Sequence, residues 1–118
     1  MPISLKRAYD DAAPDDGYRV LVDGIWPRGI SKENAKLHEW KREIAPSKEL
    51  RRRFHDGSLP WGDFRRRYLS ELKNHRDALR VLAKRAEDKN VTLVFGSADQ
   101  EHNNAVVLKQ YLEMLKVP

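Results

Sequence analysis

The stretch VTLVFGSADQEHNN, residues 91–104, gives the clearest indication of the fold class of this chain. Its first five residues are a continuous apolar run, which is typical of a strand buried on both faces of a sheet. The polar segment that follows ends where helical spacing begins, with one apolar face formed by Ala105, Leu108, Leu112 and Leu115. A buried strand that leads directly into a helix favours an α/β domain.

A second stretch, YRVLVDGIWPRG at residues 18–29, has the same form. Its apolar run, residues 18–22, also ends in a polar loop, and residues 3–9 alternate like a half-buried strand. Residues 37–45 fit either a helix or a further extended segment. The sequence therefore predicts one α/β domain over residues 1–118, with a small, at least partly parallel sheet of three or four strands covered by helices.

Capping residues predict where helices begin between these strands. Ser31 is a good N-cap for a single turn, and Ser47 for a short helix that ends near Gly57. We expect the next helix to start at Asp63 and a further one after a break at Asn74.

Composition excludes several classes of protein. The 118 residues contain no cysteine, which excludes disulfides and thiolate chemistry and permits a reducing compartment. No apolar run approaches the ~20 residues of a membrane span, so we expect a cytoplasmic protein without a membrane partner. The four histidines lack metal-binding spacing and there is no glycine-rich phosphate loop, so we predict no metal and no cofactor.

Positive charge is concentrated in the middle of the chain. Residues 41–85 hold 14 Lys and Arg against 6 Asp and Glu, while the whole chain has a net charge of +5. The triple-arginine runs at 51–53 and 65–67 fan around their helices, so we expect most of these side chains to be solvated. One functional interpretation is that a single arginine of each run, Arg51 and Arg65, turns inward to the cleft. The alternative is a surface that follows nucleic-acid phosphates.

The loop after residues 18–22 has the features of a ligand-binding loop. In parallel sheets, ligands bind beyond the carboxyl ends of the strands. Pro27 fixes its own φ and restricts Trp26 to extended conformations, which directs Arg28. Trp26 either covers the sheet edge or stacks on a ligand. Asp23 either pairs with Arg28 or accepts a hydrogen bond from a ligand hydroxyl.

The loop after residues 91–95 offers a matching anion site. Ser97 or Asp99 can begin the last helix, whose free N–H groups would then face the same cleft as Arg28. His102 would lie in the first helical turn, which keeps its imidazole neutral and makes it a candidate base. Asn103 is either a capping group or a ligand contact.

The segments RVLVDGIWPRG, IAPSKELRRRFH, FRRRYLSEL and EHNNAVVL together resemble the YeaO-like family, small bacterial proteins that carry a domain-of-unknown-function label. The resemblance implies a single α/β domain and no established activity. Its matching positions include the following candidate ligand-binding residues: Arg19, Trp26, Arg28, Arg51, His55, Tyr68 and Asn103. His55 can equally cap its helix. Members usually have arginine at Gly24 and lysine at Ala98, so this cleft either takes a less anionic ligand or does not need those side chains.

Two functions from different classes follow. The first is a cleft that binds a small anion or a nucleotide, with or without catalysis, in which Arg28 holds the anion, His102 is the base and Asp23 orients it. The second is a non-enzymatic nucleic-acid-binding domain that uses residues 41–85. A third option is a module that recognises an acidic protein partner.

Overall fold

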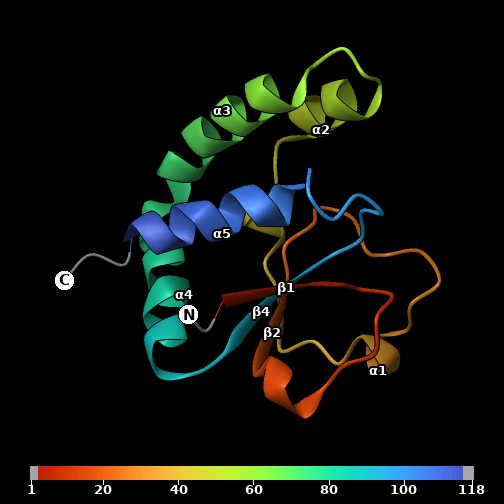
Figure 1. The fold of residues 1–118 in the computed structure, drawn as a ribbon, viewed down its shortest axis with the longest axis vertical. Helices are drawn as coiled ribbons and strands as arrows, with labels where there is room; N and C mark the ends of the chain where they lie inside the picture. The colour runs from red at the N-terminus through yellow and green to blue at the C-terminus, as the bar shows by residue number, and fades with distance from the viewer. Residues whose placement is uncertain (1–2, 116–118) are drawn as a thin grey trace.

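Four parallel strands form the sheet in the computed structural model, which describes residues 3–115 (Figure 1). Their order is β1-β4-β2-β3, with bounds Ile3–Arg7 for β1, Tyr18–Leu21 for β2, Glu39–Trp40 for β3 and Val91–Phe95 for β4. Strand β4 lies between β1 and β2, where Leu93 is opposite Leu5 on one side and Val20 on the other. The predicted α/β fold with an at least partly parallel sheet is confirmed, and β2 pairs with β4 in parallel.

The longer helices pack on one face of the sheet. They are α2 (Lys48–His55), α3 (Trp61–Leu72), α4 (Arg76–Asp88) and α5 (Asn104–Leu115). Helix α5 packs against β1, β4, α3 and α4, which encloses the main apolar core between the sheet and the helices (Figure 1). Between residues 3 and 115, no helix has both the length and the apolar character needed to cross a bilayer.

A buried ion pair organises the other face of the sheet. Arg19 Nη1 donates to Asp16 Oδ2 at 2.6 Å, and Lys6 Nζ donates to Asp16 Oδ1 at 3.0 Å. Arg19 Nη2 also donates to the Ala35 carbonyl at the end of α1 (Lys32–Ala35), at 2.8 Å. Because only 3% of Arg19 is exposed and its donors are engaged inside the protein, the prediction that it binds a ligand is wrong.

The segment of ambiguous spacing contains both kinds of structure. Residues 37–45 include the short strand β3 and then a 3-10 turn at Arg42–Ile44. The predicted N-caps before α1 and α2 are confirmed, because Ser31 Oγ accepts from Asn34 N–H at 3.0 Å and Ser47 Oγ accepts from Leu50 N–H at 3.3 Å.

Two other helix starts differ from the prediction. Helix α3 begins at Trp61 rather than Asp63, because the Pro60 carbonyl already accepts the Phe64 N–H at 2.9 Å. The break near Asn74 is a 3-10 turn, Lys73–His75, and α4 starts after it without a side-chain cap. In both places backbone hydrogen bonds, rather than a capping side chain, set the boundary.

Replacing Asp16 with asparagine is expected to destabilise the protein by about 3–5 kcal/mol, because Arg19 would stay buried without its counter-charge. Burial acts to raise the pKa of Asp16, but hydrogen bonds from Ala13, Lys6 and Arg19 hold that pKa below its usual value. The charge-dependent stability is therefore complete above the unfolded pKa of about 4 and is lost as the pH falls through the lower folded pKa.

Urea unfolding of the wild type and of Asp16→Asn, at neutral pH and in an acid series, measures both effects. The difference in unfolding free energy between the two proteins should shrink toward low pH. An unfolding free energy for the variant that equals the wild-type value at pH 7 would contradict a structural role for this pair.

Candidate ligand-binding site

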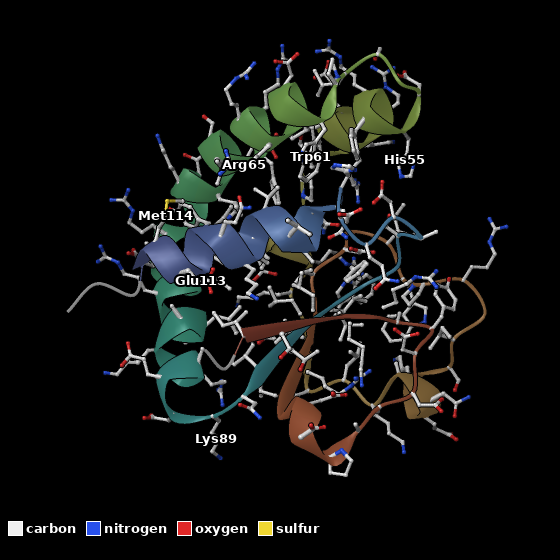
Figure 2. The ribbon with its side chains drawn as sticks, viewed as in Figure 1. His55, Trp61, Arg65, Lys89, Glu113 and Met114 are labelled. Atoms are coloured by element: carbon white, nitrogen blue, oxygen red, sulfur yellow. The ribbon has the colours of Figure 1, made fainter. Side chains whose placement is uncertain are left out.

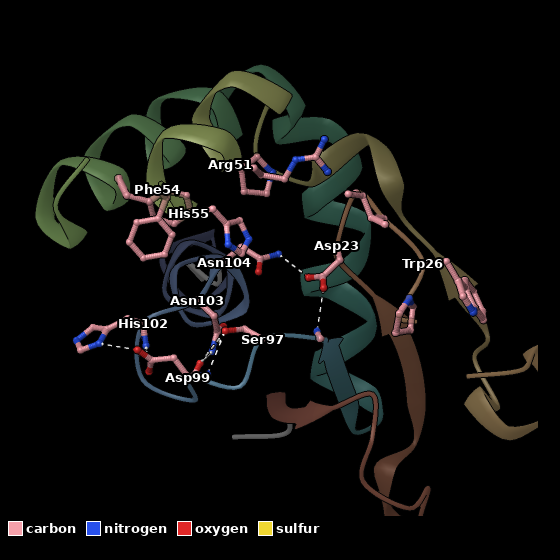
Figure 3. A pocket seen from close by; sticks show the side chains of 16 residues that line it. Asp23, Trp26, Arg51, Phe54, His55, Ser97, Asp99, His102, Asn103 and Asn104 are labelled. Carbon is pink, nitrogen blue, oxygen red and sulfur yellow. Dashed lines mark hydrogen bonds and ion pairs between the residues drawn. The ribbon is translucent and has the colours of Figure 1, made fainter. Parts of the chain in front are cut away.

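A pocket of about 450 Å³ lies at the carboxyl ends of β2 and β4 (Figure 3). This volume is within the range of about 300–1,000 Å³ that is usual for small-molecule sites. The pocket is formed by the loops after these two strands together with α2, α3 and the start of α5, through the residues Asp23, Gly24, Ile25, Trp26, Pro27, Pro46, Arg51, Phe54, His55, Phe64, Gly96, Ser97, Asp99, His102, Asn103 and Asn104. The parallel pairing of β2 with β4 is what brings the two loops together.

Asp23 connects the two strands and the last helix at the pocket. Its Oδ2 accepts the Gly96 N–H at 2.8 Å, and its Oδ1 accepts from Asn104 Nδ2 at 3.1 Å. Asn104 Nδ2 donates also to the Val22 carbonyl at 3.0 Å. Burial raises the pKa of Asp23 above its usual value, against the opposing effects of these hydrogen bonds and of the nearby charge of Arg51.

His102 lies at the pocket but not in a helix. Helix α5 begins at Asn104, and Asn103 Oδ1 caps it by accepting the Val106 N–H at 3.1 Å. The prediction that Ser97 or Asp99 begins this helix, with His102 in its first turn, is therefore wrong. Asp99 instead forms its own turn, in which its Oδ1 accepts the N–H of Glu101 at 2.9 Å and of His102 at 3.0 Å.

These contacts also fix the partner of the imidazole. The Nδ1 atom of His102 lies 3.2 Å from Asp99 Oδ2, and the ring meets that of Trp61 edge to face. The backbone hydrogen bonds from Glu101 and His102 lower the pKa of Asp99, and the hydrogen bond with the His102 imidazole lowers it further. His102 is therefore partnered by Asp99 and not by Asp23, the acid that the sequence suggested.

Arg51 reaches the pocket from α2 and has a buried, unsatisfied nitrogen. Its Nη1 atom is inaccessible to solvent and has no hydrogen-bond partner in the part of the chain that the structure describes. Figure 3 shows the guanidinium extending from α2 above Asp23. Of the two arginines expected to turn inward, Arg51 does so, whereas Arg65 Nε donates to Gln110 Oε1 on α5 at 2.8 Å (Figure 2).

Aromatic side chains form the apolar part of the wall. Phe54 of α2 stacks on Phe64 of α3 with ring centroids 4.3 Å apart. Trp26 lines the pocket too, with its Nε1 donating to the Ile30 carbonyl at 2.6 Å and its ring packed edge to face on Trp40. This position is compatible with both alternatives for Trp26, which were to cover the sheet edge or to stack on a ligand.

Phe54, Phe64 and Asn104 are among the lining residues that sequence reasoning did not propose. The phenylalanines have the helical spacing of core residues, and nothing in that pattern distinguishes a core from a pocket wall. Phe54 could have been found from its neighbour in the sequence, His55, which was a candidate site residue. His55 is exposed at the end of α2 and also lines the pocket (Figure 2).

Two residues predicted to bind the ligand lie elsewhere. Arg28 is exposed and does not line the pocket, because the chain turns away at Gly29, where φ is 81°. Its carbonyl accepts a hydrogen bond from the Tyr9 hydroxyl at 3.0 Å. Tyr68 is fully buried and donates to the Ile44 carbonyl at 2.7 Å, and burial raises its pKa well above the usual value. The expectation that either side chain faces the cleft is wrong.

Among residues 3–115, no group of three or more histidine, aspartate or glutamate side chains is placed to share a metal ion. The pocket instead offers one unsatisfied cationic donor, one half-buried carboxylate and a wall of aromatic rings.

The molecule is thus an α/β domain with a polar and aromatic pocket at the carboxyl ends of two parallel strands. The chain belongs to the inactive DUF488-N3 subclade, whose family profile matches residues 2–116. It is 44% identical to the uncharacterized protein YeaO of Escherichia coli K12, across 98% of this chain and 100% of that protein. An uncharacterized protein of Mycobacterium tuberculosis H37Rv is 40% identical across 93% of this chain and 92% of its own. No solved structure matches the chain.

Replacing Asn104 with alanine is expected to lower the free energy of unfolding by about 1–3 kcal/mol, because the acceptors at Val22 and Asp23 lose a donor in a half-buried place. The pKa of Asp23 should rise, since the hydrogen bond from Asn104 lowers it. Urea unfolding and a carbon-13 NMR titration of the Asp23 carboxyl measure the two effects. Asn74→Ala, on the exposed 3-10 turn, is the control and should change neither; equal behaviour of both variants would show that Asn104 does not join the loops.

Proposed function

We propose that the pocket binds a nucleotide-like monophosphate: a planar ring that carries an anionic group and at least one hydroxyl. The anionic group would lie at Arg51, a hydroxyl would donate to Asp23, and the ring would pack on the aromatic wall. The size of the pocket suits such a compound.

The observation that carries the proposal is the Nη1 atom of Arg51. A buried donor without a partner costs about 1–3 kcal/mol, more when it is charged, so such groups need an explanation. Arg51 lies on the wall of the largest described pocket, and a guanidinium binds phosphate or carboxylate oxygens through paired hydrogen bonds. Arg51 as a whole is only half-buried, so an anion in the pocket would bond to the rest of the guanidinium and balance its charge.

Asp23 supports a ligand that has a hydroxyl beside its anionic group. Each of its carboxylate oxygens accepts one hydrogen bond, from Gly96 or Asn104, and has capacity for another. A bare anion next to this carboxylate would be repelled, whereas a hydroxyl can donate to it. Phe54 and Trp26, which Figure 3 shows on opposite sides of Asp23, offer aromatic surface for a ring.

Binding without turnover is the form of this function that we favour. The matching subclade is described as inactive. The acid and the base that the sequence suggested, Asp23 and His102, have separate hydrogen-bond partners, so they do not act as a coupled pair. Neither residue is bonded to a hydroxyl nucleophile that lines the pocket.

The nucleic-acid alternative has weaker support. Several arginines of the basic segment are engaged within the protein: Arg52 pairs with Asp56, Arg65 bonds to Gln110 and Arg66 pairs with Asp63. The ion pairs of Arg52 and Arg66 reduce their contribution to a continuous positive face, and the bond to Gln110 directs Arg65 toward α5.

The test is isothermal titration with adenosine 5′-monophosphate, adenosine and inorganic phosphate. The monophosphate should bind more tightly than either fragment. Arg51→Gln should weaken its binding about tenfold to a hundredfold, the value of one charged hydrogen-bonding partner, and leave the adenosine affinity unchanged. Because Nη1 has no partner to lose, the unfolding free energy should not fall, and it should rise to the extent that the buried unpaired donor was unfavourable.

Arg52→Gln is the matched control, since it removes the same charge from the same helix at an exposed position. It should leave the affinity close to the wild-type value. Equal affinities for the monophosphate and adenosine, or equal losses in the Arg51 and Arg52 variants, would contradict the proposal. So would the absence of binding at millimolar concentration.

A further inference from the structure

Gly24 has no conformational reason to be glycine. Gly17, Gly29 and Gly57 have positive φ, but Gly24 does not, so its backbone would accept any L-residue. The reason lies in the space beside it. A Cβ atom at position 24 would lie 1.8 Å from Arg51 Nη1 and 2.8 Å from its Cζ. The guanidinium therefore occupies the volume that a side chain at position 24 would fill.

We propose that Gly24 determines the ligand specificity of the pocket, because its missing side chain is what allows the Arg51 guanidinium to lie inside and bind an anionic group. Gly24 is thus a positioning residue that acts through Arg51. This inference rests on the proposed function, and it adds the position in the chain that decides between anionic and neutral ligands.

A side chain at position 24 would displace Arg51 rather than the backbone. The atoms that a Cβ would strike are the far end of a flexible side chain, so Arg51 can move while the backbone stays in place. The guanidinium would then leave the space beside Gly24 that it now fills. The donor that is buried without a partner would then be hydrated, which removes an unfavourable term from the folded state.

Stability and binding should therefore change independently in Gly24→Ala. We expect its melting temperature to equal or exceed that of the wild type, because alanine also restricts the unfolded chain. Its affinity for adenosine 5′-monophosphate should fall by the same factor as in Arg51→Gln, while adenosine binds as before. Gly62→Ala, on the exposed side of α3 and outside the pocket, is the matched control and should leave both affinities unchanged.

The double variant separates displacement of Arg51 from obstruction by the new methyl group. If Gly24 acts through Arg51, Gly24→Ala adds no further loss of affinity when Arg51→Gln is already present. A further loss in the double variant, or reduced adenosine binding in Gly24→Ala, would mean that the methyl group blocks the pocket, and would overturn the inference.

A measurement made without ligand tests the inference about Gly24 independently of the proposed function. The charge of Arg51 lowers the pKa of Asp23, so an NMR titration of the Asp23 carboxyl reports where the guanidinium lies. The pKa should rise in Gly24→Ala as it does in Arg51→Gln. If only Arg51→Gln raises it, the inference about Gly24 is wrong even where the monophosphate binds. If both raise it and the monophosphate does not bind, Gly24 positions Arg51 but the proposed ligand, and with it the specificity role, is wrong.

Discussion

The hydrogen bonds of one carboxylate, that of Asp23, hold the pocket together. Parallel pairing of β2 and β4 brings their carboxyl ends to one edge, but it does not fix the loops that follow. Asp23 does so because its two oxygens accept donors from the end of β4 and from the first residue of α5. The loop that carries His102 is thereby held beside Asp23, across the pocket from Arg51 and His55 of α2.

A comparison of the buried Asp16 with the half-buried Asp23 shows how the fold separates stability from binding. Asp16 receives two cationic partners, Lys6 and Arg19, and its pKa is lowered. Asp23 receives only neutral donors, while Arg51 lies near without bonding to it, and burial raises its pKa. The first acid is fully compensated within the protein, and the second retains capacity for a group from outside.

The sequence predicted the strands and the edge where the loops meet because apolar runs of strand length depend on local pattern alone. The start of α5 was misplaced because Ser97, Asp99 and Asn103 are all good capping residues, and only packing decides which one caps the helix. Arg28 was misplaced because the Trp-Pro pair fixes the backbone before it, while the turn at Gly29 sends its side chain outward. The arginine runs suggested that Arg51 and Arg65 turn inward, and only Arg51 lines the pocket, because the packing of each helix decides which of its arginines does so.

The space at Gly24 shows why pocket chemistry is the part of a structure that is hardest to read from sequence. A glycine in a loop usually indicates a turn with positive φ, and the local pattern DGIWPRG favours that interpretation. Here the space beside the glycine is filled by the side chain of Arg51, 27 positions further along the chain. This contact exists only once α2 has packed beside the loop after β2. The arginine likewise has the appearance of any surface charge until that packing buries its Nη1 atom. Neither the glycine nor the unpartnered arginine is informative alone, and only their contact in the folded protein supports the proposed anion site.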